Sequence, residues 1–397
     1  MLNTKIALPF KYIMLTFILL GTFFIPNSYF AAEEIESFSW QDTLLNLDID
    51  SLDEYKKNVD AEVGNYLNHK PLKEWLIDFM KGDWKFDLKE IGEDLFTRLF
   101  KEVLANSGLL GKLLILSVLA ALLINLQTAF SSDIAKISYL ACFLALCAIA
   151  LGSFKIVLSI GQNTVENMVA FMIGMLPQMM VLVAGLGNIN SSVVLFPFLM
   201  TAATALANTI KNIVFPLIIL SAILSVVNHV SETIKVERLA NFMRQVAQIS
   251  LGFFVTIFVG VVTLRALYAS ALDKVALRTT KFVTDNAIPI VGKMFSDTIE
   301  VAAGYVTMLK QGLGVFGVII ILGIIIFPLL KIVAIALIYK ISATIVEPLG
   351  DVKTAAILET MSSHLFLMLA AVAAVALMFL IMIAIVVGIS NHAIMLR

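Results

Sequence analysis

The sequence has few charged residues. Only 14% of its 397 residues are Asp, Glu, Lys or Arg, whereas a soluble domain has about a quarter. Common catalytic patterns are missing too: the four histidines do not form an HExxH pattern, and neither a GxSxG nucleophile elbow nor a Walker A loop occurs. The sequence therefore predicts no catalytic, cofactor-binding or metal site, and we expect a protein that is not an enzyme.

Cysteine is scarce as well. The two cysteines, Cys142 and Cys147, lie in one apolar run and lack the CxxC spacing of redox and zinc motifs. They are predicted to be small buried hydrophobic residues rather than a disulfide. The formal net charge is −1, so no basic excess favours a nucleic acid as partner.

Apolar residues make up 60% of the chain, and the mean hydropathy is +0.95. One membrane span cannot raise the average that far, because each span needs only about 20 residues to cross the hydrocarbon. We expect an all-α, polytopic membrane protein in contact with the lipid bilayer. The first 32 residues have the layout of a signal peptide or signal anchor, with Lys5 and Lys11 ahead of an apolar run over residues 12–25.

Residues 33–108 have a different character, since acidic residues outnumber basic ones about two to one. A capping box at Ser51 and Glu54, a helix start at Pro71 and a periodic stretch from residue 86 predict three amphipathic helices in an extracytoplasmic region. The third helix carries the stripe of partner-docking candidates, Leu95, Phe96, Leu99 and Phe100. A self-contained small bundle remains an equally good interpretation of this region.

Residues 109–397 form the predicted polytopic membrane domain, with seven or eight spans. Amphipathic helices at the membrane interface are expected over 231–245, 271–310 and 341–363, where charge and apolar residues mix at helical spacing. The candidate spans are 109–130, 137–160, 168–187, 193–209, 213–230, 246–269, 313–339 and 365–389.

Prolines and lysines interrupt several of these apolar runs. Proline removes a backbone N–H and clashes with the preceding turn, so each one predicts a kink or a break. We expect a hairpin between two short helices at Lys211, with the amine reaching the interface. Broken helices that line a water-filled path are the alternative, favoured by a possible repeat at an offset of 112 residues between prolines. The residues predicted to form kinks or to line a pore are Pro177, Pro197, Lys211, Pro216, Pro328 and Lys331.

The overall layout resembles the stage III sporulation protein AE family of endospore-forming bacteria. It consists of a signal segment, an acidic helical region, then a polytopic half with the stretch Asn-x-Val-Phe-Pro-Leu at residues 212–217. The resemblance implies a multi-pass protein of the mother-cell membrane, facing the forespore. It implies a structural or conducting subunit of a trans-envelope channel or secretion-like complex. Its implied partners are other stage III sporulation proteins, a forespore-membrane protein and a separate ATPase. A self-sufficient secondary transporter is the alternative function.

Overall fold

The computed structural model describes residues 88–130, 133–230, 235–287 and 291–389. All of the secondary structure assigned there is helical, which confirms the all-α prediction. The predicted signal segment, the capping box at Ser51 and the helix start at Pro71 lie outside the described residues. In chain order the elements are α5 (Leu88–Ala105), α6 (Ser107–Phe130), α7 (Asp133–Gly185), α8 (Ile189–Thr209), the π-helix η2 (Ile210–Val214), α9 (Phe215–Val230), α10 (Glu237–Ala287), α11 (Val291–Val346), the 3₁₀-helix η3 (Glu347–Leu349) and α12 (Val352–Gly388).

The helices are much longer than the predicted spans. Within the described residues, six segments are long and apolar enough to cross a membrane. The predicted break between 137–160 and 168–187 is wrong, since residues 137–185 all belong to α7, which has 53 residues. At about 1.5 Å per residue, this helix is about 80 Å long, more than twice the thickness of a bilayer's hydrocarbon.

The other predicted separations are wrong for the same reason. The runs 193–209 and 213–230 belong to one unbroken helical rod made of α8, η2 and α9. Residues 237–245 begin α10, residues 271–287 end it, and 291–310 begin α11, so the expected interfacial helices are continuous with the long helices. The stretch 341–363 is divided between the end of α11, η3 and the start of α12.

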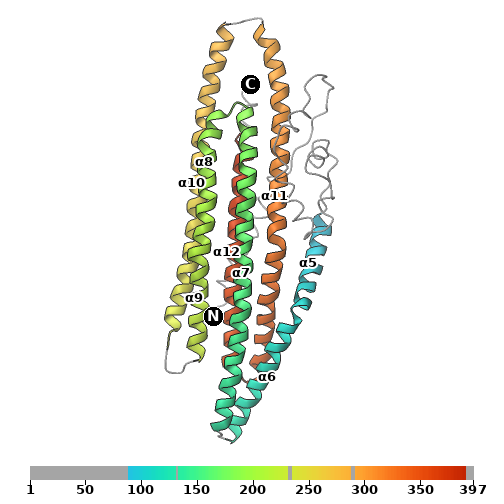
Figure 1. Ribbon diagram of the computed structural model, residues 1–397, viewed down its shortest axis with the longest axis vertical. Helices are drawn as coiled ribbons and strands as arrows, with labels where there is room; N and C mark the ends of the chain where they lie inside the picture. The colour runs from blue at the N-terminus through green and yellow to red at the C-terminus, as the bar shows by residue number, and fades with distance from the viewer. Residues whose placement is uncertain (1–87, 131–132, 231–234, 288–290, 390–397) are drawn as a thin grey trace.

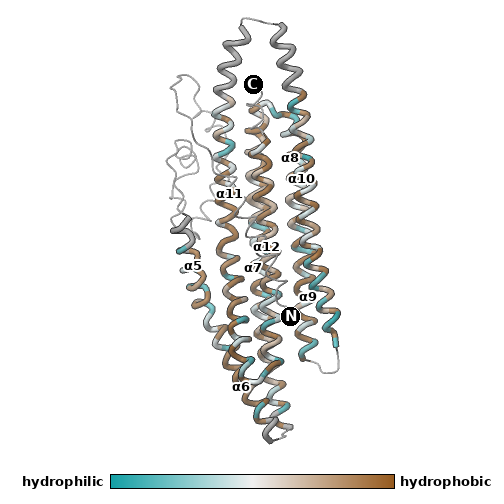
Figure 2. Tube along the Cα trace, turned by 180° about the vertical axis from the view of Figure 1, so that it is seen from behind, coloured by the Kyte–Doolittle hydropathy of each residue, from teal (hydrophilic) through white to brown (hydrophobic). Residues whose placement is uncertain are grey.

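The long helices pack side by side into an elongated bundle (Figure 1). α12 packs against α7, α9, α10 and α11, so it lies at the centre, while α6 pairs with α7 and α10 pairs with α8 and α9. Apolar residues run along most of the length of α7, α11 and α12 (Figure 2). Among the buried side chains, the rings of Phe171 and Phe316 meet edge to face with centroids 6.4 Å apart.

Two turns show how the sequence ends one helix and begins the next. Gly187, with φ of 81°, follows α7, and Gly350, with φ of 93°, follows η3, so each glycine takes the left-handed conformation that other residues avoid. Asp351 then caps α12 by accepting from the Thr354 N–H at 3.0 Å. The Tyr139 hydroxyl donates to the same carboxylate at 3.1 Å, which fixes the start of α7 to the start of α12.

Close contact between α11 and α12 depends on small residues. A methyl group added at Gly314 would overlap Cγ2 of Val387 on α12, and one added at Gly317 would lie 3.2 Å from Cδ1 of Ile383 on α12 and overlap the end of Met175 on α7. Gly312, Gly314 and Gly317 match the GxGxxG spacing of dinucleotide-binding loops, but they lie inside α11 rather than between a strand and a helix. The glycines therefore serve helix packing here.

Gly314→Ala should destabilise the bundle. Val387 is β-branched and cannot turn away easily, so the added methyl forces α11 and α12 apart, at a cost of about 1–3 kcal/mol. Gly260→Ala is the matched control, because a Cβ at Gly260 meets nothing within 4 Å. The melting temperature of the full chain in detergent should fall for Gly314→Ala alone, and equal melting of the two variants would contradict this account of the packing.

Candidate functional site

A patch of polar side chains lies on the outer surface of the bundle, on α7 and on the rod formed by α8 and η2. Glu166 and Lys211 form an ion pair across these elements, with 53% and 33% of their side-chain surfaces exposed. Both residues are accompanied by asparagines at helical spacing, and these are all exposed. We call this set the polar patch: Asn163, Glu166, Asn167, Asn208, Lys211 and Asn212.

The two halves of the polar patch have nearly the same sequence. Residues 163–167 read NTVEN and residues 208–212 read NTIKN, so they differ by a Val/Ile exchange and by the sign of one charge. The threonine hydroxyl of each half donates to the carbonyl four residues earlier, Thr164 to Ile160 at 2.7 Å and Thr209 to Ala205 at 2.8 Å. The structure thus brings two matching pentapeptides together with opposite charges facing each other.

The π-helix η2 contains Lys211, and Pro216 explains its position. The proline ring clashes with the carbonyl of the residue four positions earlier and supplies no N–H. A wider preceding turn makes room for this carbonyl, which belongs to Asn212. The Phe215 N–H accordingly donates to the carbonyl of Ile210, five residues back, as in a π-helix. The hairpin expected at Lys211 is therefore wrong: the chain stays helical, and the amine pairs with Glu166.

Apolar surface surrounds the polar patch on both sides along the helix axes. Exposed apolar side chains follow it towards one end of the bundle, at Ile173 and Val193, and towards the other, at Ile156 and Leu220. Behind the patch the interior is filled, because Val165 and Met168 are at most 1% exposed. The patch is thus a polar island on an apolar surface, with a packed core beneath it.

The remaining predicted kink and pore residues lie on three helices. Pro177, Pro197 and Pro328 are inside α7, α8 and α11, none of which they interrupt, so no break occurs at these prolines, and the kinks stay a prediction. Lys331 is on α11, which packs on α5, α6, α7 and α12.

The predicted docking stripe is divided by the structure. α5 packs against α11, and the Arg98 guanidinium lies 5.1 Å from the centroid of the Phe327 ring. Leu95 and Leu99 are partly buried, whereas Phe96 and Phe100 are 69% and 62% exposed. Only the two phenylalanines are free to meet a partner.

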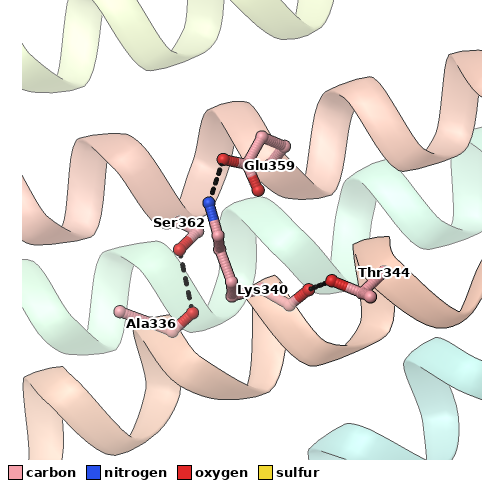
Figure 3. A network of polar contacts seen from close by, with 5 residues as sticks. All are labelled: Ala336, Lys340, Thr344, Glu359 and Ser362. Atoms are coloured by element: carbon pink, nitrogen blue, oxygen red, sulfur yellow. Dashed lines mark hydrogen bonds and ion pairs between the residues drawn. The ribbon is translucent and has the colours of Figure 1, made fainter. Parts of the chain in front are cut away.

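A second polar cluster joins α11 to α12, with Lys340 paired to Glu359 (Figure 3). Nearby, the Ser362 hydroxyl donates to the Ala336 carbonyl at 2.9 Å. Both side chains of the ion pair are about half exposed, so they stabilise the register of the two helices only weakly. Among the residues that the structure describes, no three His, Cys, Asp or Glu side chains come together to hold a metal ion.

Comparison with known proteins gives the family. The model of the stage III sporulation protein AE family matches residues 71–390. The chain belongs to this family. A relative named stage III sporulation protein AE, from Bacillus subtilis strain 168, is 35% identical over 356 residues, which are 89% of each chain. No solved structure matches. Family membership gives the chain a role in sporulation, and the six apolar helices make it a multi-pass membrane protein.

The NTVEN and NTIKN pentapeptides are the signal in the sequence that could have revealed the polar patch. The offset between them is 45 residues, whereas the prolines suggested 112. Pro216 follows a π-helix and Pro328 lies inside an α-helix, so the surroundings of these two prolines differ.

Proposed function

We propose that this chain is a membrane subunit of a trans-envelope channel or secretion-like complex that links mother cell and forespore during endospore formation. In this proposal it has a structural or conducting role and no enzymatic one. The observation that carries it is the polar patch, an ion pair and four asparagines on the outside of an apolar bundle. Membership of the sporulation family supplies the cellular context.

The polar patch is costly on a surface that faces lipid. Hydrocarbon offers no hydrogen bonds to four asparagine side chains, and a charge in the middle of a bilayer costs several kcal/mol unless it is paired or hydrated. The pairing of Glu166 with Lys211 removes part of this cost but leaves the amides unsatisfied. In the assembled complex, therefore, the polar patch faces a water-filled conduit between subunits.

A self-sufficient transporter fits this arrangement less well. Such a protein needs a path through its own interior, with polar groups along it. Here the helices stay unbroken and the core beside the polar patch is packed: Gly161 lies against Val372 and Phe215, both of which are 0% exposed. The polar groups are on the outside, which favours a conduit made by several chains.

The other parts of such a complex would come from separate proteins. We propose that this chain lies in the mother-cell membrane facing the forespore, with residues 33–108 in the space between the two membranes. Other stage III sporulation proteins, a forespore-membrane protein and a separate ATPase would complete the assembly.

Cysteine labelling in sporulating cells tests the conduit. In a Cys142→Ala, Cys147→Ala background, Asn212→Cys should react with a small hydrophilic thiol reagent, because the polar patch faces water. Ile257→Cys is the control, since Ile257 is 46% exposed on α10 and lacks polar neighbours on adjacent turns. The complex must be present during labelling. If Asn212→Cys reacts no faster than Ile257→Cys, the polar patch does not line a conduit.

A further inference from the structure

A second polar site lies at the end of α9, away from the polar patch. A cavity of about 230 Å³ opens there between α9, the first turns of α10 and α12. This volume is several times what one water molecule needs, but smaller than the pockets that take drug-sized ligands. Its polar lining includes Asn228, His229, Glu237, Asn241, Arg244 and His364.

Several of these side chains are held in place by hydrogen bonds. His364 is 1% exposed, with Nδ1 2.7 Å from the Thr360 carbonyl and Nε2 2.9 Å from the Ser221 hydroxyl. In His229, Nδ1 lies 2.7 Å from the Ser225 carbonyl, which leaves Nε2 for another partner. The Oδ1 atom of Asn228 accepts from the Val236 N–H at 3.1 Å, so its amide NH₂ group remains to donate.

Arg244 is the cation of this cavity, and its guanidinium makes no hydrogen bond or ion pair with any residue that the structure describes. A half-buried guanidinium has five donors and requires acceptors. Glu237 is the carboxylate among the lining residues, but it is exposed in the first turn of α10 and does not pair with Arg244. Among the residues that the structure describes, the site thus presents several donors, and no anion is paired with Arg244.

We propose that this cavity binds the phosphate group of a small anion, either free phosphate or the headgroup of an anionic lipid. The guanidinium fork of Arg244 would hold two phosphate oxygens, while the amides of Asn228 and Asn241 approach from α9 and α10. Donors on separate helices suit a tetrahedral anion better than a planar carboxylate. The first turn of α10 adds the positive end of a helix dipole.

The position of the cavity suits a lipid headgroup as well as a free ion. It lies where the apolar stretch of α9 ends at Val230, and the exposed cations Lys235 and Arg238 lie beside it in sequence. Basic residues at the end of a span attract anionic lipids. This site is independent of the polar patch, so it stands whether or not the proposed conduit exists.

A thermal-stability titration of the purified full chain in detergent tests the proposal. Inorganic phosphate should raise the melting temperature, while sodium chloride at equal ionic strength should not, because only a ligand of the native state stabilises it. Arg244→Gln should weaken the apparent affinity about tenfold or more, since it removes the charge-assisted bonds. Arg238→Gln removes an equal charge outside the cavity and should leave the affinity within about twofold of the original.

Glu237→Gln should change the affinity for phosphate in the direction opposite to Arg244→Gln. It keeps the test decisive if Arg244→Gln does not fold. Removing this carboxylate from the rim of the cavity should tighten phosphate binding, because it repels an incoming anion. Equal responses of the original chain, Glu237→Gln and Arg238→Gln, or stabilisation by chloride alone, would overturn the proposal.

Native mass spectrometry distinguishes the two sources of phosphate. The purified chain is placed in nanodiscs with and without phosphatidylglycerol. It is then released from the nanodiscs in the mass spectrometer, and the lipid that stays bound is identified. Retention of phosphatidylglycerol that is lost in Arg244→Gln but kept in Arg238→Gln identifies a lipid site, and a response to inorganic phosphate alone identifies a free-ion site. If neither phosphatidylglycerol nor inorganic phosphate depends on Arg244, the cavity is not an anion site.

Discussion

Lys211→Glu should abolish the formation of heat-resistant spores, and adding Glu166→Lys should restore it. The single change replaces a balanced pair by two negative charges on the wall of the proposed conduit, where charge decides what passes. The exchange Glu166→Lys with Lys211→Glu rebuilds the pair in reverse and keeps the polar patch polar.

Counts of heat-resistant spores and immunoblots of membrane fractions should be measured together. Lys340→Glu, with and without Glu359→Lys, is the matched control, because that pair has a similar exposure but joins α11 to α12 and does not belong to the polar patch. Its single variant should cost about 1 kcal/mol or less. Lys211→Gln decides between two interpretations of the lysine. Near-normal sporulation would fit an amine that only reaches the membrane interface. A sporulation defect would fit a functional ion pair with Glu166. Failure of the reversed pair to restore any spores would show that the orientation of the charges matters, and not just their pairing.

Replacing Phe96 and Phe100 by Ser should abolish recovery of the complex and leave the amount of protein in the membrane unchanged. Both rings are largely exposed on α5, with centroids 6.5 Å apart. Aromatic side chains of this kind dominate the energy of protein interfaces, and the loss of each costs about 2 kcal/mol or more. Two such losses weaken association about a thousandfold.

Leu95→Ser with Leu99→Ser is the matched comparison on the same helix. These leucines are partly buried, so their replacement should lower the amount of the protein itself. Affinity purification from sporulating cells, with the membrane fraction blotted in parallel, separates the two outcomes. Normal recovery of partners with the Phe96 and Phe100 variant would mean that this face of α5 meets lipid instead.

The sequence predicted the class of the fold well because hydrophobicity determines it. Long apolar runs can only be helices in lipid, and the stripe from residue 86 predicted α5 correctly. The spacing of Leu95, Phe96, Leu99 and Phe100 could not show which of the four face inwards, since a stripe this wide has room for both a contact with α11 and a free surface.

Breaks between helices were predicted wrongly for a physical reason. The candidate spans were separated at residues 161–167 and 210–212, where Glu166 and Lys211 lie, because polar residues commonly mark the ends of spans. In the structure a polar residue is accommodated within a helix when a partner on the next helix satisfies it, as Glu166 does for Lys211. Such pairing depends on which helices are neighbours, and hydropathy along one sequence carries no information about that.

The unbroken length of α7 makes it a rigid lever. Near its start, Tyr139 is bound to the cap of α12, and near its end the carbonyl of Met180 accepts from the Ser192 hydroxyl on α8 at 2.9 Å. Between Tyr139 and Pro177 the helix contains no proline, the usual cause of a sharp kink, so this part of α7 does not bend locally to absorb a push. A tilt imposed at the start of α7 would therefore move Glu166 relative to Lys211, so the contact between the two pentapeptides would respond to force applied far away from it.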